Sequence, residues 1–328
     1  MSRPTITTEQ SQSLETAILD FPRPAADTLW AFSGPDLFSG ELGEYKNFCE
    51  HYSELINSVL DGDIPHDTDG CSVSTPSATP RQPLGIFFEQ RIADFISLPA
   101  FPLSIALRNF QINDAGKTKG ELDFVLSDER CNLIHLEAAI KFYLLRQECL
   151  EPHRWKHWIG PNSVDRLDKK LHRMLTHQLP LGKASINKLP SPSNNQSTAS
   201  FASMYFLKGV FFYHWQQERL LPAHANPAAH SGVWLYRKEW LDLLRSSNSK
   251  WLALNKHQWL IASLPGYLRR YERLIAATTL HDQVRQRGEE YFPRLFLEVA
   301  TQGASPEERL VMVVSDYWPE TKSPSLMR

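Results

Sequence analysis

Four charged residues lie within two otherwise apolar segments of the chain and have side chains suited to chemistry on a phosphate ester. Glu121 and Asp123 belong to GELDFVL, and Glu137 and Lys141 belong to HLEAAIKFYL. Two or three carboxylates can hold Mg²⁺, which activates a water molecule and stabilises negative charge on a phosphate. A lysine nearby can orient that water or stabilise charge. These residue types therefore fit metal-dependent hydrolysis of a phosphodiester.

Both segments alternate polar and apolar residues in the way that predicts β-strands. The later segment places His135, Glu137 and Lys141 on one face of its strand. The earlier segment places Glu121 and Asp123 on one face, opposite the leucines and the phenylalanine between and after them. If the strands are neighbours, acids and a lysine share a face of a sheet. The alternative interpretation is a pair of ordinary strands whose charged side chains lie on an open solvent face.

The surrounding segments predict the order helix, strand, strand, strand, helix, strand. The first helix is LGIFFEQRIADFISL, which should end before Pro99. Its apolar face is expected to consist of Ile86, Phe87, Ile92, Phe95 and Ile96. The expected strands are LSIALRNFQI, ELDFVLSD, NLIHLEAAIKFYLL and FASMYFLKGVFFYHW. The second and third of these strands carry the acidic residues.

The second helix is predicted over NSVDRLDKKLHRMLTHQL, with Asn162 or Ser163 as its N-cap. Its apolar face is expected to contain Val164, Leu167, Leu171 and Leu175. Its other face carries Arg166, Lys169, Lys170 and Arg173. These cations could contact a nucleic-acid backbone, or they could form an ordinary solvated face. Gln178 near the end of the helix is either a capping or solvent contact or a part of the site.

The composition indicates a globular protein that is not basic overall. The chain has 328 residues, is 42% hydrophobic and carries a formal net charge of −2, so contact with nucleic acid would have to be local. The four cysteines have no close spacing, which favours reduced thiols over a zinc ribbon or a disulfide framework. No apolar run is long enough for a membrane span. We therefore expect a cytoplasmic protein with DNA or RNA as its possible partners.

Two polar segments, 61–83 and 189–200, are rich in Pro, Ser, Asn or acidic residues and read as exposed linkers or loops. The segment before the first linker has helical periodicity. The C-terminal third contains Trp234, Trp240, Trp251 and Trp259. These rings could stack on bases, but packing in a hydrophobic core is the favoured interpretation.

The segments LGIFFEQRIADFI, GELDFVL, HLEAAIKFYL and GPNSVDRLDKKLHRMLTHQLPL together resemble an uncharacterised bacterial domain family assigned to the PD-(D/E)XK nuclease superfamily. The resemblance to the nuclease core covers about Pro83 to Trp215, and the family similarity extends over most of the chain. It implies an α/β fold with a restriction-endonuclease-like core (αβββαβ). The implied organisation is a helical N-terminal extension with a linker at 1–82, the core at 83–216, and a mixed C-terminal extension packed on the core at 217–328.

The same resemblance implies roles for particular residues. Asp123 matches the acidic residue of the second core strand, and Glu137 matches that of the third. Glu89 matches an additional carboxylate on the first helix, so that Asp123, Glu137 and Glu89 would bind Mg²⁺ or Mn²⁺. Lys141 would orient the attacking water or stabilise charge. The implied activity is nucleic-acid phosphodiester hydrolysis.

The spacing of the lysine departs from the superfamily motif, which has the lysine two positions after the acid, where this chain has Ala139. Two positions on a strand separate side-chain origins by roughly 6.6 Å, whereas the four positions from Glu137 to Lys141 give roughly 13 Å. The alternative function is therefore a catalytically inactive nuclease-fold module that binds nucleic acid or protein. An amine of Lys141 within a few ångströms of the two carboxylates would favour the enzyme.

Overall fold

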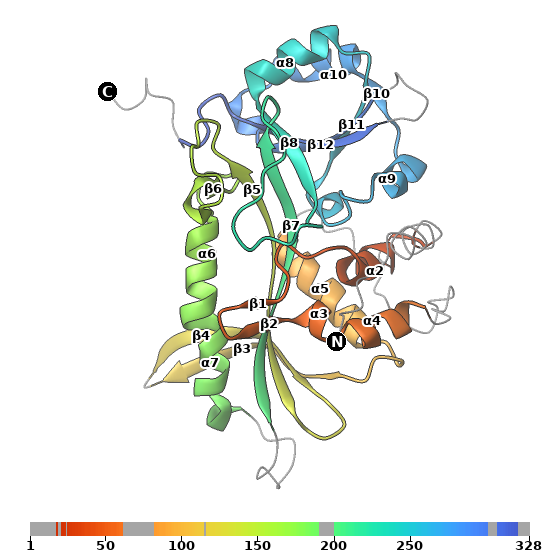
Figure 1. The fold of residues 1–328 in the computed structure, drawn as a ribbon. Coiled ribbons are helices and arrows are strands. Elements are labelled where there is room, and N and C mark those ends of the chain that lie inside the picture. The colour runs from red at the N-terminus through yellow and green to blue at the C-terminus, as the bar shows by residue number, and fades with distance from the viewer. Residues whose placement is uncertain are drawn as a thin grey trace. The chain divides into compact units, whose positions relative to one another are not determined.

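The computed structural model describes residues 18, 21–23, 25–61, 82–114, 116–189, 200–300 and 307–320. Most of the expected linker and of the expected loop lies outside these residues. The described chain is mixed α/β, as expected, and divides into two compact units (Figure 1). Unit 1 comprises 1–140 and 173–207, and unit 2 comprises 141–172 and 208–328. None of the helices in the described ranges is both long and apolar enough to cross a bilayer.

The strands of unit 1 form a mixed sheet. They are β1 (Glu41–Leu42), β2 (Tyr45–Asn47), β3 (Ser104–Asp114), β4 (Lys117–Ser127) and the first parts of β5 (Leu133–Leu145) and β7 (Phe201–His214). β3, β4 and β5 are antiparallel neighbours, whereas β2 runs parallel to β7. β5 lies between β4 and β7. The neighbouring strands β4 and β5 carry the acidic residues.

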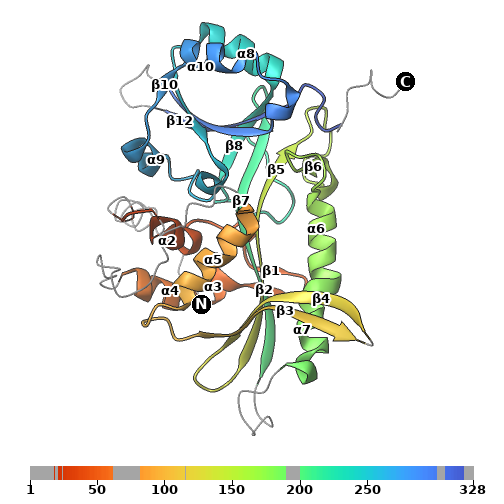
Figure 2. The ribbon, with the colours of Figure 1, turned by 180° about the vertical axis from the view of Figure 1, so that it is seen from behind.

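Helices cover both faces of the unit 1 strands. They are α2 (Ala25–Ser33), α3 (Phe48–His51), α4 (Ser53–Leu60), α5 (Leu84–Ile96), a π-helical segment η2 (Met174–Gln178), α7 (Leu179–Ala184) and a short 3₁₀ turn η3 (Ile186–Lys188). α2, α4 and α5 lie on one side of the strands and α7 on the other (Figures 1 and 2). Phe32 of α2 stacks on Phe95 of α5 with ring centroids 3.9 Å apart, so the N-terminal helices pack onto the sheet-covering helix.

Helix α5 has the expected extent but buries a different stripe of residues. Ile86 is 46% exposed, whereas Phe88 is fully buried together with Ile92 and Phe95. Positions 88, 92 and 95 follow the four- and three-residue steps of one helical face, and position 86 lies off that face. The expected apolar face was therefore wrong for Ile86 and for the half-buried Phe87.

The second predicted helix begins later than expected. α6 (Leu167–Arg173) starts five residues after Asn162, whose Oδ1 accepts hydrogen bonds from the main-chain N–H groups of Val164 and Asp165. Asn162 therefore holds a turn ahead of the helix and does not act as its N-cap. Val164 is 72% exposed, so its expected place on the apolar face is also wrong, although Leu167 and Leu171 are buried as expected.

Unit 2 contains a second mixed group of strands. They are β6 (Trp158–Ile159), β8 (Ser231–Tyr236), β9 (Lys250–Leu254), β10 (Ile275–Ala276), β11 (Arg294–Val299), β12 (Glu308–Val314) and the later parts of β5 and β7. Its helical segments are η1 (Trp155–His157), α6 up to residue 172, α8 (Arg237–Ser246), η4 (Lys256–Trp259), α9 (Pro265–Tyr271), α10 (Ala277–Val284) and η5 (Glu289–Tyr291). β8 is parallel to β7 and to β12, whereas β9, β11 and β12 are antiparallel in turn.

The core of unit 2 forms where α8 and α10 pack against β8, β9, β11 and β12. Trp240 of α8 lies with its ring centroid 4.5 Å from that of Phe296 on β11. The four tryptophans expected in the core, Trp234, Trp240, Trp251 and Trp259, are each no more than 3% exposed. The core interpretation is confirmed, and these rings are not available to stack on bases.

Candidate carboxylate site

Asp123 and Glu137 lie where the ladder between β4 and β5 ends. The last pair of that ladder joins Phe124 to Leu136. Directly beyond it, Oδ2 of Asp123 accepts a hydrogen bond of 3.0 Å from the main-chain N–H of Ala138. A side chain thus replaces the next main-chain contact, and it fixes the Asp123 carboxylate against the peptide that follows Glu137.

The regular alternation of β4 breaks at Asp123. Leu122 and Val125 pack in one hydrophobic cluster with Leu189, although a regular strand directs residues three positions apart to opposite faces. Across the ladder on β3, Asn109 has a φ of +52°, a left-handed conformation that a short polar side chain tolerates. The simple two-face pattern expected for this strand is therefore wrong at Asp123, which lies at the opening between the strands.

Glu137 is almost completely buried and both of its oxygens accept hydrogen bonds. Oε1 lies 3.1 Å from Nε2 of His135, and Oε2 accepts a bond of 2.6 Å from Nε2 of Gln178. The side chain is 1% exposed. Acidic groups are rarely buried unless they are paired. The interpretation of β5 as a strand with an open charged face is therefore wrong for Glu137.

His135 links Glu137 to Ser203. The Ser203 hydroxyl donates to the main-chain oxygen of Leu179 at 2.9 Å, so it can accept from Nδ1 of His135, which lies 3.4 Å away. Serine, histidine and glutamate also occur together in hydrolases. Here the ring is fully buried, with the main chain of Gly182 against it, so this chain of bonds holds Glu137 in place.

Gln178 reaches Glu137 from the π-helical segment η2, which joins α6 to α7. A π-turn inserts an extra residue into a helix and changes the direction of the side chains that follow. The sequence left Gln178 open between a solvent contact and a part of the site. In the structure Gln178 donates a hydrogen bond to Glu137, and a regular helical period does not predict this contact.

Glu89 of α5 lies within electrostatic range of the same group. Burial raises the pKa of the Glu89 carboxyl, and the charges of Glu121 and Glu137 raise it further. The nearby Arg108 guanidinium and a hydrogen bond from Asn109 oppose that rise. The structure therefore brings Glu89 close enough to Glu121 and to Glu137 for its charge to interact with each of theirs.

Lys141 is held elsewhere. Its Nζ lies 3.2 Å from Oδ1 of Asp165, with the two side chains 29% and 42% exposed. Both residues belong to unit 2, whereas Asp123 and Glu137 belong to unit 1. The structure gives the amine a carboxylate partner outside the pair that the sequence singled out.

The fit of a divalent cation depends on the number of carboxylates that can reach it. Within the described ranges, no three His, Cys, Asp or Glu side chains form a group that could hold a metal ion. Mg²⁺, however, is commonly bound by one or two carboxylates together with water and substrate oxygens. A carboxylate has about four lone-pair positions, so a hydrogen-bonded one can still act as a ligand. Asp123 and Glu137 are the two carboxylates that such a site would use, and the ligand roles of Asp123, Glu137 and Glu89 stay predictions.

The family model for a domain of unknown function, DUF1853, matches residues 27–314. The chain belongs to the DUF1853 family. The match includes all the residues of the candidate site and residues of both units of the DUF1853 domain. Neither a curated protein nor a solved structure matches the chain.

The basic residues expected to contact nucleic acid lie on or next to α6 of the DUF1853 domain. Nη2 of Arg166 lies 2.6 Å from Oδ2 of Asp168, so the charge of this arginine is already compensated. Lys169 and Arg173 are exposed, and Lys170 is partly exposed. The role of these residues in binding nucleic acid stays a prediction.

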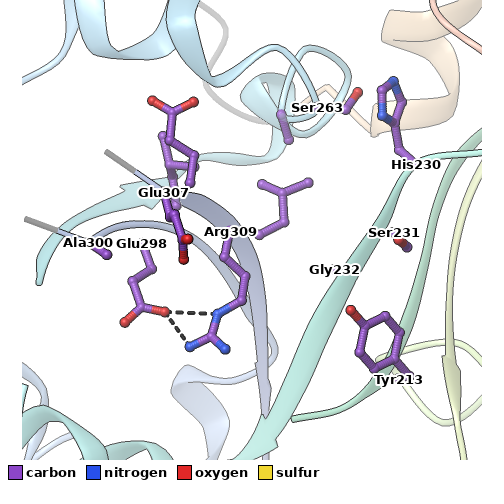
Figure 3. A pocket seen from close by; sticks show the side chains of 13 residues that line it. Tyr213, His230, Ser231, Gly232, Ser263, Glu298, Ala300, Glu307 and Arg309 are labelled. Atoms are coloured by element: carbon purple, nitrogen blue, oxygen red, sulfur yellow. Dashed lines mark hydrogen bonds and ion pairs between the residues drawn. The ribbon is translucent and has the colours of Figure 1, made fainter. Parts of the chain in front are cut away.

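Unit 2 of the DUF1853 domain also contains a cavity of 510 Å³, which the sequence did not reveal (Figure 3). It is lined by residues of β7, β8, β11 and β12 and by the turn at 262–263, among them Tyr213, His230 and Glu298. Nε of Arg309 donates to Glu298 at 3.0 Å within the wall. The volume lies in the range of small-molecule pockets. Because its residues come from four separate strands, no local motif indicates it.

Proposed function

We propose that this DUF1853 protein hydrolyses phosphodiester bonds of nucleic acid with Mg²⁺ or Mn²⁺ held by Asp123 and Glu137. The observation that carries the proposal is the hydrogen bond from Ala138 to Asp123, which fixes one carboxylate beside the strand position of the other. The order α5, β3, β4, β5, α6, β7 supports it, because it follows the αβββαβ order of the PD-(D/E)XK nucleases that the sequence resembles, with the two-residue strand β6 and the helix α7 as additions.

Hydrogen bonds within the chain orient the two carboxylates that would bind such an ion. Metal-ligating carboxylates are usually held by further hydrogen bonds that orient them. Gln178 and His135 do this for Glu137, and the Ala138 N–H does it for Asp123. A bound Mg²⁺ would supply an activated water and neutralise charge on the phosphate.

Cleavage of single-stranded and duplex DNA and RNA with Mg²⁺ or Mn²⁺ tests the proposal. Asp123→Asn and Glu137→Gln keep the shape of each side chain and should abolish cleavage that the wild type shows. Asp114→Asn is the matched control, because this exposed carboxylate at the end of β3 pairs with Lys188. Circular dichroism confirms folding. Absence of cleavage by the wild type on all four substrates, or equal cleavage by all variants, refutes the hydrolase.

The ion pair between Lys141 and Asp165 favours a second candidate, an inactive nuclease-fold module that binds nucleic acid. With its lysine held by another carboxylate, the fold would keep a binding surface without the charge stabilisation that hydrolysis needs. This candidate predicts binding to nucleic acid in EDTA and no cleavage with metal. Lys169→Ala/Lys170→Ala should weaken that binding, and unchanged affinity removes α6 from the interface.

A further inference from the structure

Three cations of unit 2 lie on the faces of two aromatic rings. The Cζ atoms of Arg287 and Arg294 lie 5.7 Å and 4.4 Å from the ring centroid of Tyr291. Nζ of Lys256 lies 3.4 Å from the ring centroid of Trp259. Stacking on an aromatic face fixes the direction of a cationic side chain and adds a modest attraction. We call Lys256, Arg287, Arg294 and Tyr291 the cation cluster.

The charges of the cation cluster lack carboxylate partners. Within the part of the chain that the structure describes, no Asp or Glu oxygen lies within ion-pair distance of Lys256, Arg287 or Arg294. Nε of Arg294 donates a hydrogen bond of 2.9 Å to the main-chain oxygen of Tyr291. Arg245 of unit 2 differs, since it pairs with Asp242. The cation cluster therefore presents three positive charges that have no ion-pair partner among the described residues.

Lys256 and Arg294 lie close enough for their charges to repel each other. Partial burial against the Trp259 ring and the positive charge of Arg294 lower the pKa of Lys256 to about 8. Lys256 and Arg287 are nevertheless exposed, and Arg294 is partly exposed. In a chain with a net charge of −2, such a gathering of like charge is local and is relieved by a bound anion.

We propose that the cation cluster binds the backbone of single-stranded nucleic acid. Lys and Arg contacts to phosphates give affinity without dependence on sequence. The guanidinium planes of Arg287 and Arg294 offer stacking faces that unpaired bases can use and paired bases cannot. The surface lies outside the carboxylate site, and its binding does not require hydrolysis.

Fluorescence anisotropy of a labelled 12-nucleotide single strand in EDTA tests the surface with the full chain. At 0.1 M salt each of Arg287→Gln, Arg294→Gln and Lys256→Gln should weaken binding on the order of fivefold, because each phosphate contact to a single strand releases roughly 0.7 counterion. The slope of log affinity against log salt should fall by about 0.7 per substitution. Arg245→Gln is the matched control, an exposed arginine of unit 2 that pairs with Asp242, and it should bind like the wild type.

A triple variant combines Arg287→Gln, Arg294→Gln and Lys256→Gln. Equal affinity of the wild type and this triple variant for the single strand overturns the proposal. So does tighter binding to the duplex of the same sequence, or displacement of the strand by an equal charge of polyglutamate. Arg287→Lys/Arg294→Lys keeps the charge and should retain most of the salt dependence. If the triple variant fails to fold, the exposed Arg287→Gln alone decides. Binding that persists in EDTA while the wild type cleaves no substrate supports the surface and refutes only the proposed hydrolysis.

Discussion

Nε2 of His135 lies 3.1 Å from Oε1 of Glu137, and neither side chain is more than 1% exposed. Taking a carboxylate out of water costs several kcal/mol unless partners in the protein replace its hydration. Here the imidazole and the amide of Gln178 provide that replacement. The carboxylate at the centre of the candidate site is therefore held by the fold itself.

Removing the imidazole should destabilise the folded protein, because the Glu137 carboxylate would stay buried without this partner. We expect His135→Ala to lower the free energy of unfolding by roughly 3–5 kcal/mol, as for other buried pairs that lose one partner. Urea unfolding measures the change. Ser203→Ala, which removes only the outer hydroxyl, should cost about 1 kcal/mol. In addition, His135→Leu/Glu137→Leu should be more stable than His135→Leu alone, and the opposite order contradicts a charged pair.

Two helix glycines should respond to alanine with opposite signs. A Cβ at Gly182 of α7 would lie 2.4 Å from Nδ1 of the buried His135, whereas a Cβ at Gly85 of α5 would meet no atom within 4 Å. We expect Gly182→Ala to destabilise by ~1–3 kcal/mol through overpacking. Gly85→Ala should stabilise by ~0.5–1 kcal/mol, because alanine favours the helix. Urea midpoints of the two variants give the comparison, and stabilisation by Gly182→Ala would be inconsistent with the packing on His135.

The ion pair of Lys141 with Asp165 should contribute little to stability. Both side chains keep contact with water, so we expect a coupling energy of roughly 0.5 kcal/mol from a double-mutant cycle of Lys141→Met and Asp165→Asn. The coupling should shrink as salt rises. A coupling above about 2 kcal/mol would show a desolvated pair, since exposed pairs do not reach that value.

The stability of the protein should fall at acidic pH through His230. Burial lowers the pKa of His230 to about 4, and the charge of Lys208 adds to the effect. Between pH 6.5 and 4 the unfolded chain binds a proton that the folded chain does not, so the free energy of unfolding decreases as the pH falls through this window. The loss is on the order of 3 kcal/mol. His230→Gln should flatten the profile, whereas His153→Gln, at an exposed position, should leave it unchanged.

The sequence predicted the parts of the site that depend on regular alternation. The period of β5 placed His135 and Glu137 on one face, and the hydrogen bond between them confirms it. Regular alternation could not predict the position of the Asp123 side chain. The break in the pattern lies opposite the left-handed conformation of Asn109, which is on the neighbouring strand and therefore outside the local sequence of β4.

The sequence also could not predict contacts between distant segments of the chain. Gln178 meets Glu137 through a π-turn that has no sequence period of its own. The partner of Lys141 comes from a turn 24 residues further along the chain, so spacing within β5 could not predict Asp165 as that partner. Strand positions were predictable, and tertiary partners were not.

The end of the β4–β5 ladder beside Asp123 should divide β4 into parts of different local stability. Residues 124–127 pair with both β3 and β5, whereas 117–122 pair with β3 alone. A two-stranded ribbon is only marginally stable by itself. Its main-chain amides should therefore exchange with deuterium through a local unfolding of the ribbon. The amides of 124–127 should exchange more slowly, because their exchange requires a larger unfolding that also separates β5. A ligand that bridges Asp123 and Glu137 would join the two parts and slow exchange throughout the ribbon.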